Sequence, residues 1–454
     1  MISKPYYLMV TFWGKRFTDD FYSLCLSSLL SPNNLPALAG IPGCKFIFAT
    51  SKDDWAALQS RPLFEQLRQF MEPVFIDIGC PLKGEPQILH MSKGHRLAAR
   101  RTSEDGAWGG FVSPDLIVSD GMVRLVLEHA RMGKKAVLAP ALRYAMEPVV
   151  SALAQQGLLR PDQPMCLEPR KLAAVAHRSL HSEIRKYEFD APYFGDYPIW
   201  SYWSVPGRNG IVLHTVSWAL LLGDFGKIHG RDDSVLEQDT IDGHYIDQNF
   251  YRVEHRDDLY LVSDSDEVLF MGLTSESELT YLPFRDQPIN NTAGGERDRL
   301  HNIRKFLKSP ECDEFRRWAY HVPFQIHGDE LAPESLETAR KSGTKIAHAL
   351  DMGPMDRIAQ RIFAYGFRHG FYTPERYPQS NFKLYFDGAQ FAARKFTKRI
   401  LSASLRVIFG RAIGPVLGRL NRRQLRQTMK LVPRAYLRPV LRRVHSGRSR
   451  ATST

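Results

Sequence analysis

The chain has 454 residues, a length that allows two or three domains and a large buried core. Its hydrophobic content of 43% is ordinary for a globular protein, and its formal net charge is +12. The five cysteines are widely spaced and show no metal-ligand spacing, which favours a reduced, cytoplasmic setting over a disulfide framework. The first residues lack the pattern of a signal peptide, and the longest apolar run, 211–222, is too short to span a bilayer.

The basic excess lies in one part of the chain. Residues 391–454 contain 17 Lys and Arg and no Asp or Glu, so the other 390 residues hold 44 basic and 49 acidic side chains. The high net charge is therefore a property of this tail, which we treat as a separate functional unit.

The first 145 residues alternate between apolar runs and helical patterns. Strands are expected at 6–11, 45–50, 74–78, 109–112 and 136–139, and helices at 17–30, 52–67, 92–101 and 119–132. This alternation predicts right-handed crossovers and a mainly parallel sheet. No Gly-rich phosphate loop follows the first strand, which argues against a dinucleotide-binding unit and a P-loop ATPase.

Two carboxylates follow the fourth expected strand. Asp115 comes directly after the turn Ser113-Pro114, which the proline stiffens, and Asp120 stands at the start of the next helix. Open α/β sheets bind ligands just past the carboxyl ends of central strands, so Asp115 is the stronger candidate for chemistry. Asp120 can instead serve as the acidic residue of a helix start.

The element order and this acidic turn resemble those of GT-A-type glycosyltransferases, over roughly residues 5–280. The resemblance implies an α/β fold: a Rossmann-like, mostly parallel sheet flanked by helices, with a helical C-terminal extension. Family members carry Asp-x-Asp after the fourth strand. Ser113-Pro114-Asp115 occupies that place here, so the first Asp is absent and Asp115 maps onto the last one, which contacts the metal and the diphosphate.

The resemblance also implies a donor side for a nucleotide sugar and a divalent cofactor, Mn²⁺ or Mg²⁺. Arg96 suits a bidentate phosphate contact. His214, in an apolar run, is a candidate metal contact, with a hydrogen-bonded core histidine as the alternative. The donor-side candidates are Thr11, Trp13, Gly14, His95, Arg96, Asp115 and Asp120, and the metal candidates are Asp115 and His214.

Further carboxylates lie in the second half of the chain. Asp264-Ser265-Asp266 is a literal Asp-x-Asp after the apolar run 259–262, and Asp242 lies in a polar segment before it. We expect these three aspartates on the acceptor side as catalytic residues, with Asp264 and Asp266 as a rival metal site. The alternative for Asp264 and Asp266 is a polar turn that caps the segment 267–273.

Four regions are expected. Residues 1–145 form the nucleotide-sugar-binding half, and 146–285 form the acceptor-side half of the same catalytic domain. Residues 286–390 form a helical extension, with helices at 298–307, 310–320, 336–349 and 356–371. Residues 391–454 form a basic amphipathic tail. An aromatic-rich loop at 187–203 could line a sugar site, but we expect it to serve mainly as core.

The tail mixes basic and apolar residues at helical spacing over 391–409, which is typical of segments that lie on anionic membranes. Few aromatic residues follow Phe409, so base stacking is poorly supported and nucleic acid is not the expected partner. We therefore expect a cytoplasmic protein, peripheral at the inner face of the plasma membrane. A disordered, solvated tail is the alternative.

These features lead to one main functional hypothesis. The protein transfers a sugar from a nucleoside-diphosphate donor to an envelope glycolipid or polysaccharide acceptor. A nucleotidyltransferase would need a Gly-rich loop and a lysine after the first strand, and Gly14-Lys15 alone is too little. The missing first Asp keeps open a catalytically silent α/β scaffold that docks at the membrane through its tail.

Overall fold

The computed structural model describes residues 4–191, 194–195, 197–227, 253–278, 295–309, 312 and 314–350. All of them belong to one compact unit, Met1–Asp351. Asp242, the helix expected at 356–371 and the basic tail at 391–454 lie outside the described residues.

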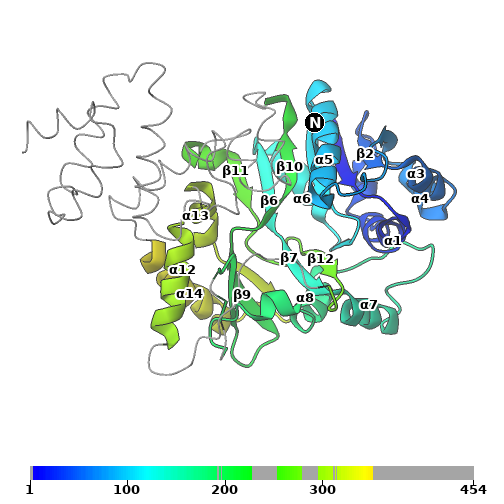
Figure 1. The fold of residues 1–454 in the computed structure, drawn as a ribbon. Helices are drawn as coiled ribbons and strands as arrows, with labels where there is room; N and C mark the ends of the chain where they lie inside the picture. The colour runs from blue at the N-terminus through cyan, green and yellow to red at the C-terminus, as the bar shows by residue number, and fades with distance from the viewer. Residues whose placement is uncertain are drawn as a thin grey trace, which may run out of the picture. The chain divides into compact units, whose positions relative to one another are not determined.

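A seven-stranded sheet forms the centre of this unit, with the strand order β11-β6-β10-β4-β1-β2-β3 (Figure 1). Six strands are parallel, and β10 runs antiparallel to its neighbours β4 and β6. Helices flank this sheet, so the α/β class with a mostly parallel central sheet is confirmed. The strands are β1 (Tyr6–Thr11), β2 (Lys45–Thr50), β3 (Glu72–Asp77), β4 (Trp108–Val112), β6 (Ala136–Pro140), β10 (Trp218–Asp224) and β11 (Leu259–Leu261).

Both faces of the sheet are buried. Alternate side chains of each strand point to opposite faces, and each face packs into its own apolar core. In β1, Leu8 and Val10 belong to one apolar core, whereas Tyr7 and Met9 belong to a second. Helix α5 (Gln87–Glu104) contributes Ala98 and Ala99 to the second core. The opposite face is covered by a run of short helices and by α6: α1 (Lys15–Asp20), η1 (Phe21–Leu26), α2 (Ser27–Leu29), α4 (Pro62–Leu67) and α6 (Met122–Arg131).

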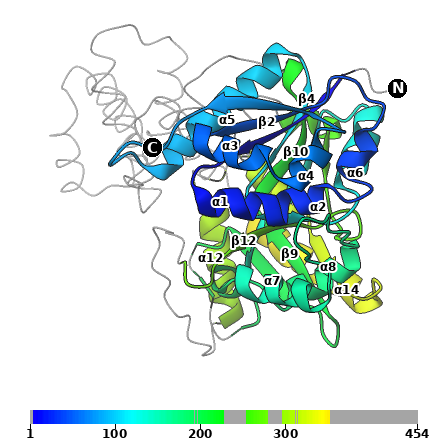
Figure 2. The ribbon, with the colours of Figure 1, turned by 90° about the vertical axis from the view of Figure 1, so that its right-hand side faces the viewer.

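Two three-stranded sheets complete the unit, in the orders β5-β12-β7 and β13-β9-β8. Their strands are β5 (Leu116–Val118), β7 (Leu142–Ala145), β8 (Trp200–Ser204), β9 (Gly210–Thr215), β12 (Phe270–Thr274) and β13 (Phe324–His327). Figure 2 shows α7, α8, β9 and β12 together on the opposite side of α1 from the large sheet. The helices of this part are α7 (Met146–Gln155), α8 (Pro169–His177), α9 (Ser182–Arg185), α12 (Gly295–Leu307), α13 (Glu314–His321) and α14 (Pro333–Leu350).

Several elements differ from the sequence-based expectation. The helix expected at 119–132 begins only at Met122, because Gly121 before it has a left-handed φ of 110°. The apolar run 211–222 is divided between two strands, β9 and β10, in different sheets. The extension contains the strand β13 in addition to α12, α13 and α14. In the aromatic loop, Trp203 stacks on Phe189 at 4.7 Å and both rings are buried, so these rings belong to the core.

Among the described helices, none combines the length and apolar character needed to cross a bilayer.

Candidate functional site

The strand order changes direction between β1 and β4, and this switch point defines the candidate site. Strand β1 pairs in parallel with β2 on one side and with β4 on the other, and Val10 is the register partner of Val112. The segments that follow these two residues therefore leave the sheet side by side. Ligands of open α/β sheets bind at the carboxyl ends of strands at such a point. The loop with Thr11, Trp13 and Gly14 and the turn that carries Asp115 therefore start from neighbouring strand ends.

The loop after β1 is held by a residue that the sequence did not single out. Gly14 has a φ of 88°, which favours glycine, and its backbone N–H donates to Asp54 Oδ2 at 2.8 Å. The other oxygen of Asp54 accepts from the Thr18 hydroxyl at 2.7 Å. Asp54 lies in the first turn of α3 (Lys52–Gln59), where Ser51 caps the helix. The only sequence signal was the helix-capping pattern that begins at Ser51. That pattern indicates where α3 starts but not that Asp54 binds Gly14 and Thr18.

Helix α5 closes the site from the second face of the sheet. A Cβ added at Gly94 would lie 2.3 Å from Thr11 Cγ2, so the helix backbone passes directly over the end of β1. The His90 ring meets the Trp13 ring edge-on, with centroids 4.8 Å apart. His95 packs against Phe111 of β4, and burial lowers the pKa of His95 to about 4, so this ring is neutral at pH 7. Arg96 follows it in the helix and is partly buried.

Asp115 is partly buried at the end of β4, and burial raises the pKa of its carboxyl. A hydrogen bond from Ser113 and the positive charges of Arg143 and Arg16 oppose that shift. Its backbone carbonyl accepts from the N–H of Leu273, which fixes the turn against β12. The turn is therefore anchored to β12, and the Asp115 carboxyl interacts with charges of both signs, those of Arg16 and Arg143 and that of Asp20.

Asp20, at the end of α1, is a second carboxylate in this region that the sequence did not reveal. Burial raises the pKa of Asp20, and the nearby charge of Asp115 raises it further. Its Oδ2 atom is buried and lacks a hydrogen-bond partner among the described residues, with Arg16 Nε at 3.7 Å. In sequence Asp20 belongs to an ordinary helix, so only the folded chain brings the two carboxylates into interaction.

Two expected site residues form hydrogen bonds within the protein. Asp120 accepts from the backbone N–H of Asn33 at 2.8 Å and from its side-chain amide at 2.6 Å. His214 is fully buried, with Nδ1 2.9 Å from the Tyr320 carbonyl and Nε2 2.9 Å from Ser342 Oγ. Both ring nitrogens of His214 are engaged in the core, and among the described residues His214 belongs to no group of side chains that could share a metal ion, so the expected ligand role of His214 is not supported.

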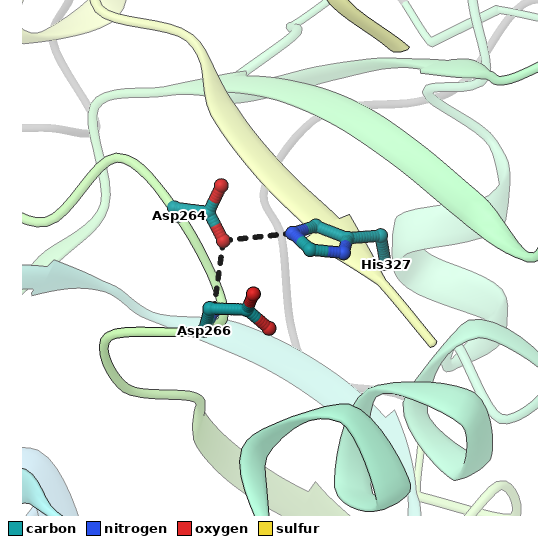
Figure 3. A group of neighbouring side chains, drawn as sticks. All are labelled: Asp264, Asp266 and His327. Atoms are coloured by element: carbon teal, nitrogen blue, oxygen red, sulfur yellow. Dashed lines mark hydrogen bonds and ion pairs between the residues drawn. The ribbon is translucent and has the colours of Figure 1, made fainter. Parts of the chain in front are cut away.

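The second Asp-x-Asp lies at the end of β11 and meets a histidine from β13 (Figure 3). Asp264 Oδ1 is 2.8 Å from His327 Nε2 and also accepts from the backbone N–H of Asp266 at 2.8 Å. One ligand atom from each of these three side chains lies within 4.8 Å of the others. The sequence missed His327, because its strand has only four residues and its partner lies 63 positions earlier.

Charge pairing shapes this second cluster. The hydrogen bond to Asp264 raises the pKa of His327. Burial alone would raise the pKa of Asp264, but hydrogen bonds from His327 and from the Asp266 N–H hold it below its usual value. Arg170, in the first turn of α8, forms a bidentate ion pair with Asp266 at 2.9 to 3.2 Å.

The two places differ in what they offer a divalent cation. The turn after β4 has the carboxylate of Asp115 and the hydroxyl of Ser113, with Asp20 as a second carboxylate whose charge interacts with Asp115. These are oxygen donors, which suit Mg²⁺ or Mn²⁺. The cluster after β11 has two carboxylates and an imidazole, a mixed set that suits a transition-metal ion.

Comparison with protein-family models gives no match, and comparison with curated proteins gives none either. Solved structures with partial likeness include mouse xyloside xylosyltransferase 1, at 11% identity and a TM-score of 0.22, covering 34% of this chain and 58% of that one. S. aureus TarS 1–349 is 9% identical with a TM-score of 0.22, covering 38% of this chain and 56% of that one. The full TarS structure is 9% identical with a TM-score of 0.20, covering 38% of this chain and 34% of that one. The chain thus spans little more than half of the first two neighbours, and at these TM-scores the likeness carries no functional argument.

Proposed function

We propose that this protein is a glycosyltransferase that moves a sugar from a nucleoside-diphosphate donor to a carbohydrate-bearing acceptor. The observation that carries the proposal is the switch point, where Val10 and Val112 are register partners and the loops with Trp13 and Asp115 emerge together. The sequence resemblance to GT-A-type enzymes supports the same reaction class, because the family's acidic turn maps onto this place.

In the reaction, an acceptor hydroxyl oxygen attacks the anomeric carbon of the donor. The bond from that carbon to the diphosphate oxygen breaks, the diphosphate leaves with the electron pair, and a base takes the hydroxyl proton. A divalent ion would neutralise charge on the leaving diphosphate, and Asp115 with Asp20 would hold it. Arg16 and Arg143, whose charges already act on Asp115, add positive charge in the same region.

The nucleoside would lie over the loop after β1. Trp13 is partly exposed and supported on one side by His90, so its ring can stack on a base or ribose. Asp54 holds the loop in place through Gly14. For the proton acceptor, the expected Asp242 is the candidate, and it lies outside the described residues.

Binding of nucleoside diphosphates and hydrolysis of a panel of nucleotide sugars, with Mn²⁺ present, test the proposal. Asp115→Asn should abolish donor hydrolysis and leave thermal stability near that of wild type, because burial already disfavours the charged carboxyl. Asp53→Asn, at an exposed aspartate of α3, is the matched control and should keep full activity. A wild-type protein that binds none of the donors would favour the silent scaffold, and full activity in Asp115→Asn would remove Asp115 from the site.

We further propose that the acceptor is an envelope glycolipid or polysaccharide and that residues 391–454 attach the enzyme to the cytoplasmic membrane face. The 17 basic residues of this segment, unopposed by any acid, support this attachment. Each basic residue near an anionic surface contributes about 1 kcal/mol. Replacing Arg394, Lys395, Lys398 and Arg399 with Gln in the full chain should weaken binding to phosphatidylglycerol vesicles at least about 100-fold. Neutral phosphatidylcholine vesicles are the control, and unchanged binding to the anionic vesicles would contradict the attachment.

A further inference from the structure

Three side chains at the ends of β11 and β13 offer ligand atoms to one point. Asp264, Asp266 and His327 each provide one such atom, and these atoms lie within 4.8 Å of one another. Ligands about 2.1 Å from a metal ion lie at most about 4.2 Å apart, so small side-chain rotations bring all three to a common ion. We propose that these residues bind one divalent transition-metal ion, of the Mn²⁺ and Zn²⁺ class, at a site separate from Asp115.

The backbone under this site is held firmly. The N–H of Gln325 donates to the Ser263 carbonyl at 2.9 Å, and the N–H of Ser265 donates to the Gln325 carbonyl at 2.8 Å. The Ser265 hydroxyl, buried, accepts from the N–H of His327 at 3.2 Å. The segment after β11 is thus paired with β13, and ligands on such paired segments keep their geometry better than ligands on free loops.

The histidine is oriented as a metal ligand requires. His327 Nδ1 is 2.7 Å from the Asp329 carbonyl, to which it donates, and this bond turns Nε2 toward Asp264. Metal-bound histidines commonly donate their second ring N–H to a carbonyl or a carboxylate, which fixes the ring. The imidazole is buried, whereas Asp266 is exposed, so a cation can enter from the side of Asp266.

A fourth oxygen donor lies on the same face of β13 as His327. Gln325 is two residues before His327 in β13, so the two share a face of the strand, and Gln325 is also the bridge partner of Asp264. Its Oε1 atom is buried and has no hydrogen-bond partner among the described residues. A buried carbonyl oxygen without a partner is costly, and a cation in this cluster would supply one.

The ligand set selects the class of cation. Imidazole nitrogen suits Zn²⁺ and other transition-metal ions, whereas Mg²⁺ and Ca²⁺ prefer oxygen ligands alone. Mn²⁺ accepts both. Arg170 forms a bidentate ion pair with Asp266, so the Arg170 guanidinium competes with a cation for the Asp266 carboxylate.

This site is distinct from the switch point. β11 and β4 are separated by β6 and β10 in the sheet order, which places the two strands about 14 Å apart at the usual strand spacing. The cation proposal therefore holds whichever reaction Asp115 serves, and it is tested without nucleotide or sugar.

Mn²⁺ binding to the metal-stripped, full-length protein, measured by electron paramagnetic resonance, is the experiment. We expect one Mn²⁺ at these three residues, displaced by Zn²⁺ more readily than by Mg²⁺. Asp264→Asn and His327→Gln should each weaken binding at these residues at least 10-fold, whereas Asp53→Asn, at an exposed aspartate of α3, should leave it unchanged. Arg170→Gln should tighten it, because Asp266 loses its competing partner.

Spin-echo modulation by ¹⁴N in the wild-type complex provides a second readout that does not depend on how the variants fold. A histidine nitrogen coupled to the bound Mn²⁺ supports the site. Bound Mn²⁺ without nitrogen coupling, affinity lost in Asp115→Asn but kept in His327→Gln, or no binding at millimolar Mn²⁺ would each overturn it. Weaker binding in Arg170→Gln would remove Asp266 from the ligands. None of these results depends on donor hydrolysis, so failure here and failure of the proposed reaction are distinguishable.

Discussion

The carboxylate of Asp54 accepts one hydrogen bond from the backbone N–H of Gly14, at 2.8 Å, and another from the hydroxyl of Thr18, at 2.7 Å. Gly14 belongs to the loop after β1, Thr18 to the helix α1, and Asp54 to α3. One buried side chain therefore connects two helices to the loop that we propose carries the nucleoside.

Asp54→Ala should lower the free energy of unfolding by about 3 kcal/mol, because hydrogen bonds to a buried charged group are among the stronger ones and their donors would remain unsatisfied. It should also weaken nucleoside-diphosphate binding at least 10-fold by loosening the loop. Urea unfolding and calorimetric titration measure the two effects. Asp53→Ala is the matched control, since Asp53 is the exposed neighbour in the same helix turn and should change stability by less than about 0.5 kcal/mol. Equal stability of the two variants would contradict the role of Asp54.

Substitution of two helical glycines by alanine should change stability in opposite directions. At Gly94 in α5, an added methyl group would lie 2.3 Å from Thr11 Cγ2 and 2.7 Å from its hydroxyl, so the helix must move away from β1. We expect Gly94→Ala to cost about 2 kcal/mol or more and to weaken donor binding. At Gly343 in α14, nothing lies within 4 Å of the added Cβ. Gly343→Ala should therefore stabilise the protein by about 0.5 to 1 kcal/mol, through helix propensity and a less flexible unfolded chain. Thermal unfolding of both variants tests this pair, and a stabilising Gly94→Ala would show that the helix is not tightly packed there.

Asp120 and Asn33 are coupled by two hydrogen bonds, of 2.8 and 2.6 Å. Asp120→Ala and Asn33→Ala should each destabilise the protein, and the double variant should be less destabilised than the sum of the two, by about 1 kcal/mol or more. A double-mutant cycle by urea unfolding measures that coupling. Donor affinity of the folded variants should be unchanged. A loss of affinity without loss of stability would return Asp120 to the donor site, where the sequence had suggested it.

The first half of the fold was accessible from the sequence because its strands are buried on both faces. Runs such as Tyr6–Thr11 and Lys45–Thr50 are almost continuously apolar and are separated by amphipathic helices of ordinary length, which indicates parallel strands with crossovers. The end of β4 could then be located, and with it Asp115. The partner Asp20 could not, because its interaction with Asp115 depends on how α1 packs across the sheet.

The second cluster shows what local patterns miss. The strand Phe324–His327 has four residues between two helices, too few for its alternation to stand out from helical neighbours. Its pairing with the segment after β11 is long-range, so nothing near Asp264 in the sequence points to His327. The same holds for His214, whose hydrogen-bond partners lie more than 100 residues away. A histidine in an apolar run is equally compatible with a metal site and a core hydrogen bond until those partners are known.

The buried His214 predicts a loss of stability in mild acid. Burial lowers the pKa of His214 to about 4, whereas an unfolded histidine has a pKa of about 6.5. Between these values the unfolded chain binds more protons than the folded one, so stability is fully present above about pH 6.5 and falls as the pH drops toward 4. One such histidine accounts for about 2 kcal/mol of the free energy of unfolding between pH 7.5 and pH 5.

Urea unfolding at these two pH values measures the effect. The free energy of unfolding should fall between pH 7.5 and pH 5 by about 2 kcal/mol less in His214→Gln than in wild type, even though the variant is less stable at pH 7.5. His301→Gln, at an exposed histidine of α12, is the matched control and should follow the wild-type pH dependence. The prediction fails if the free energies of unfolding of wild type and His214→Gln change with pH in parallel, because protonation of His214 would then not oppose folding.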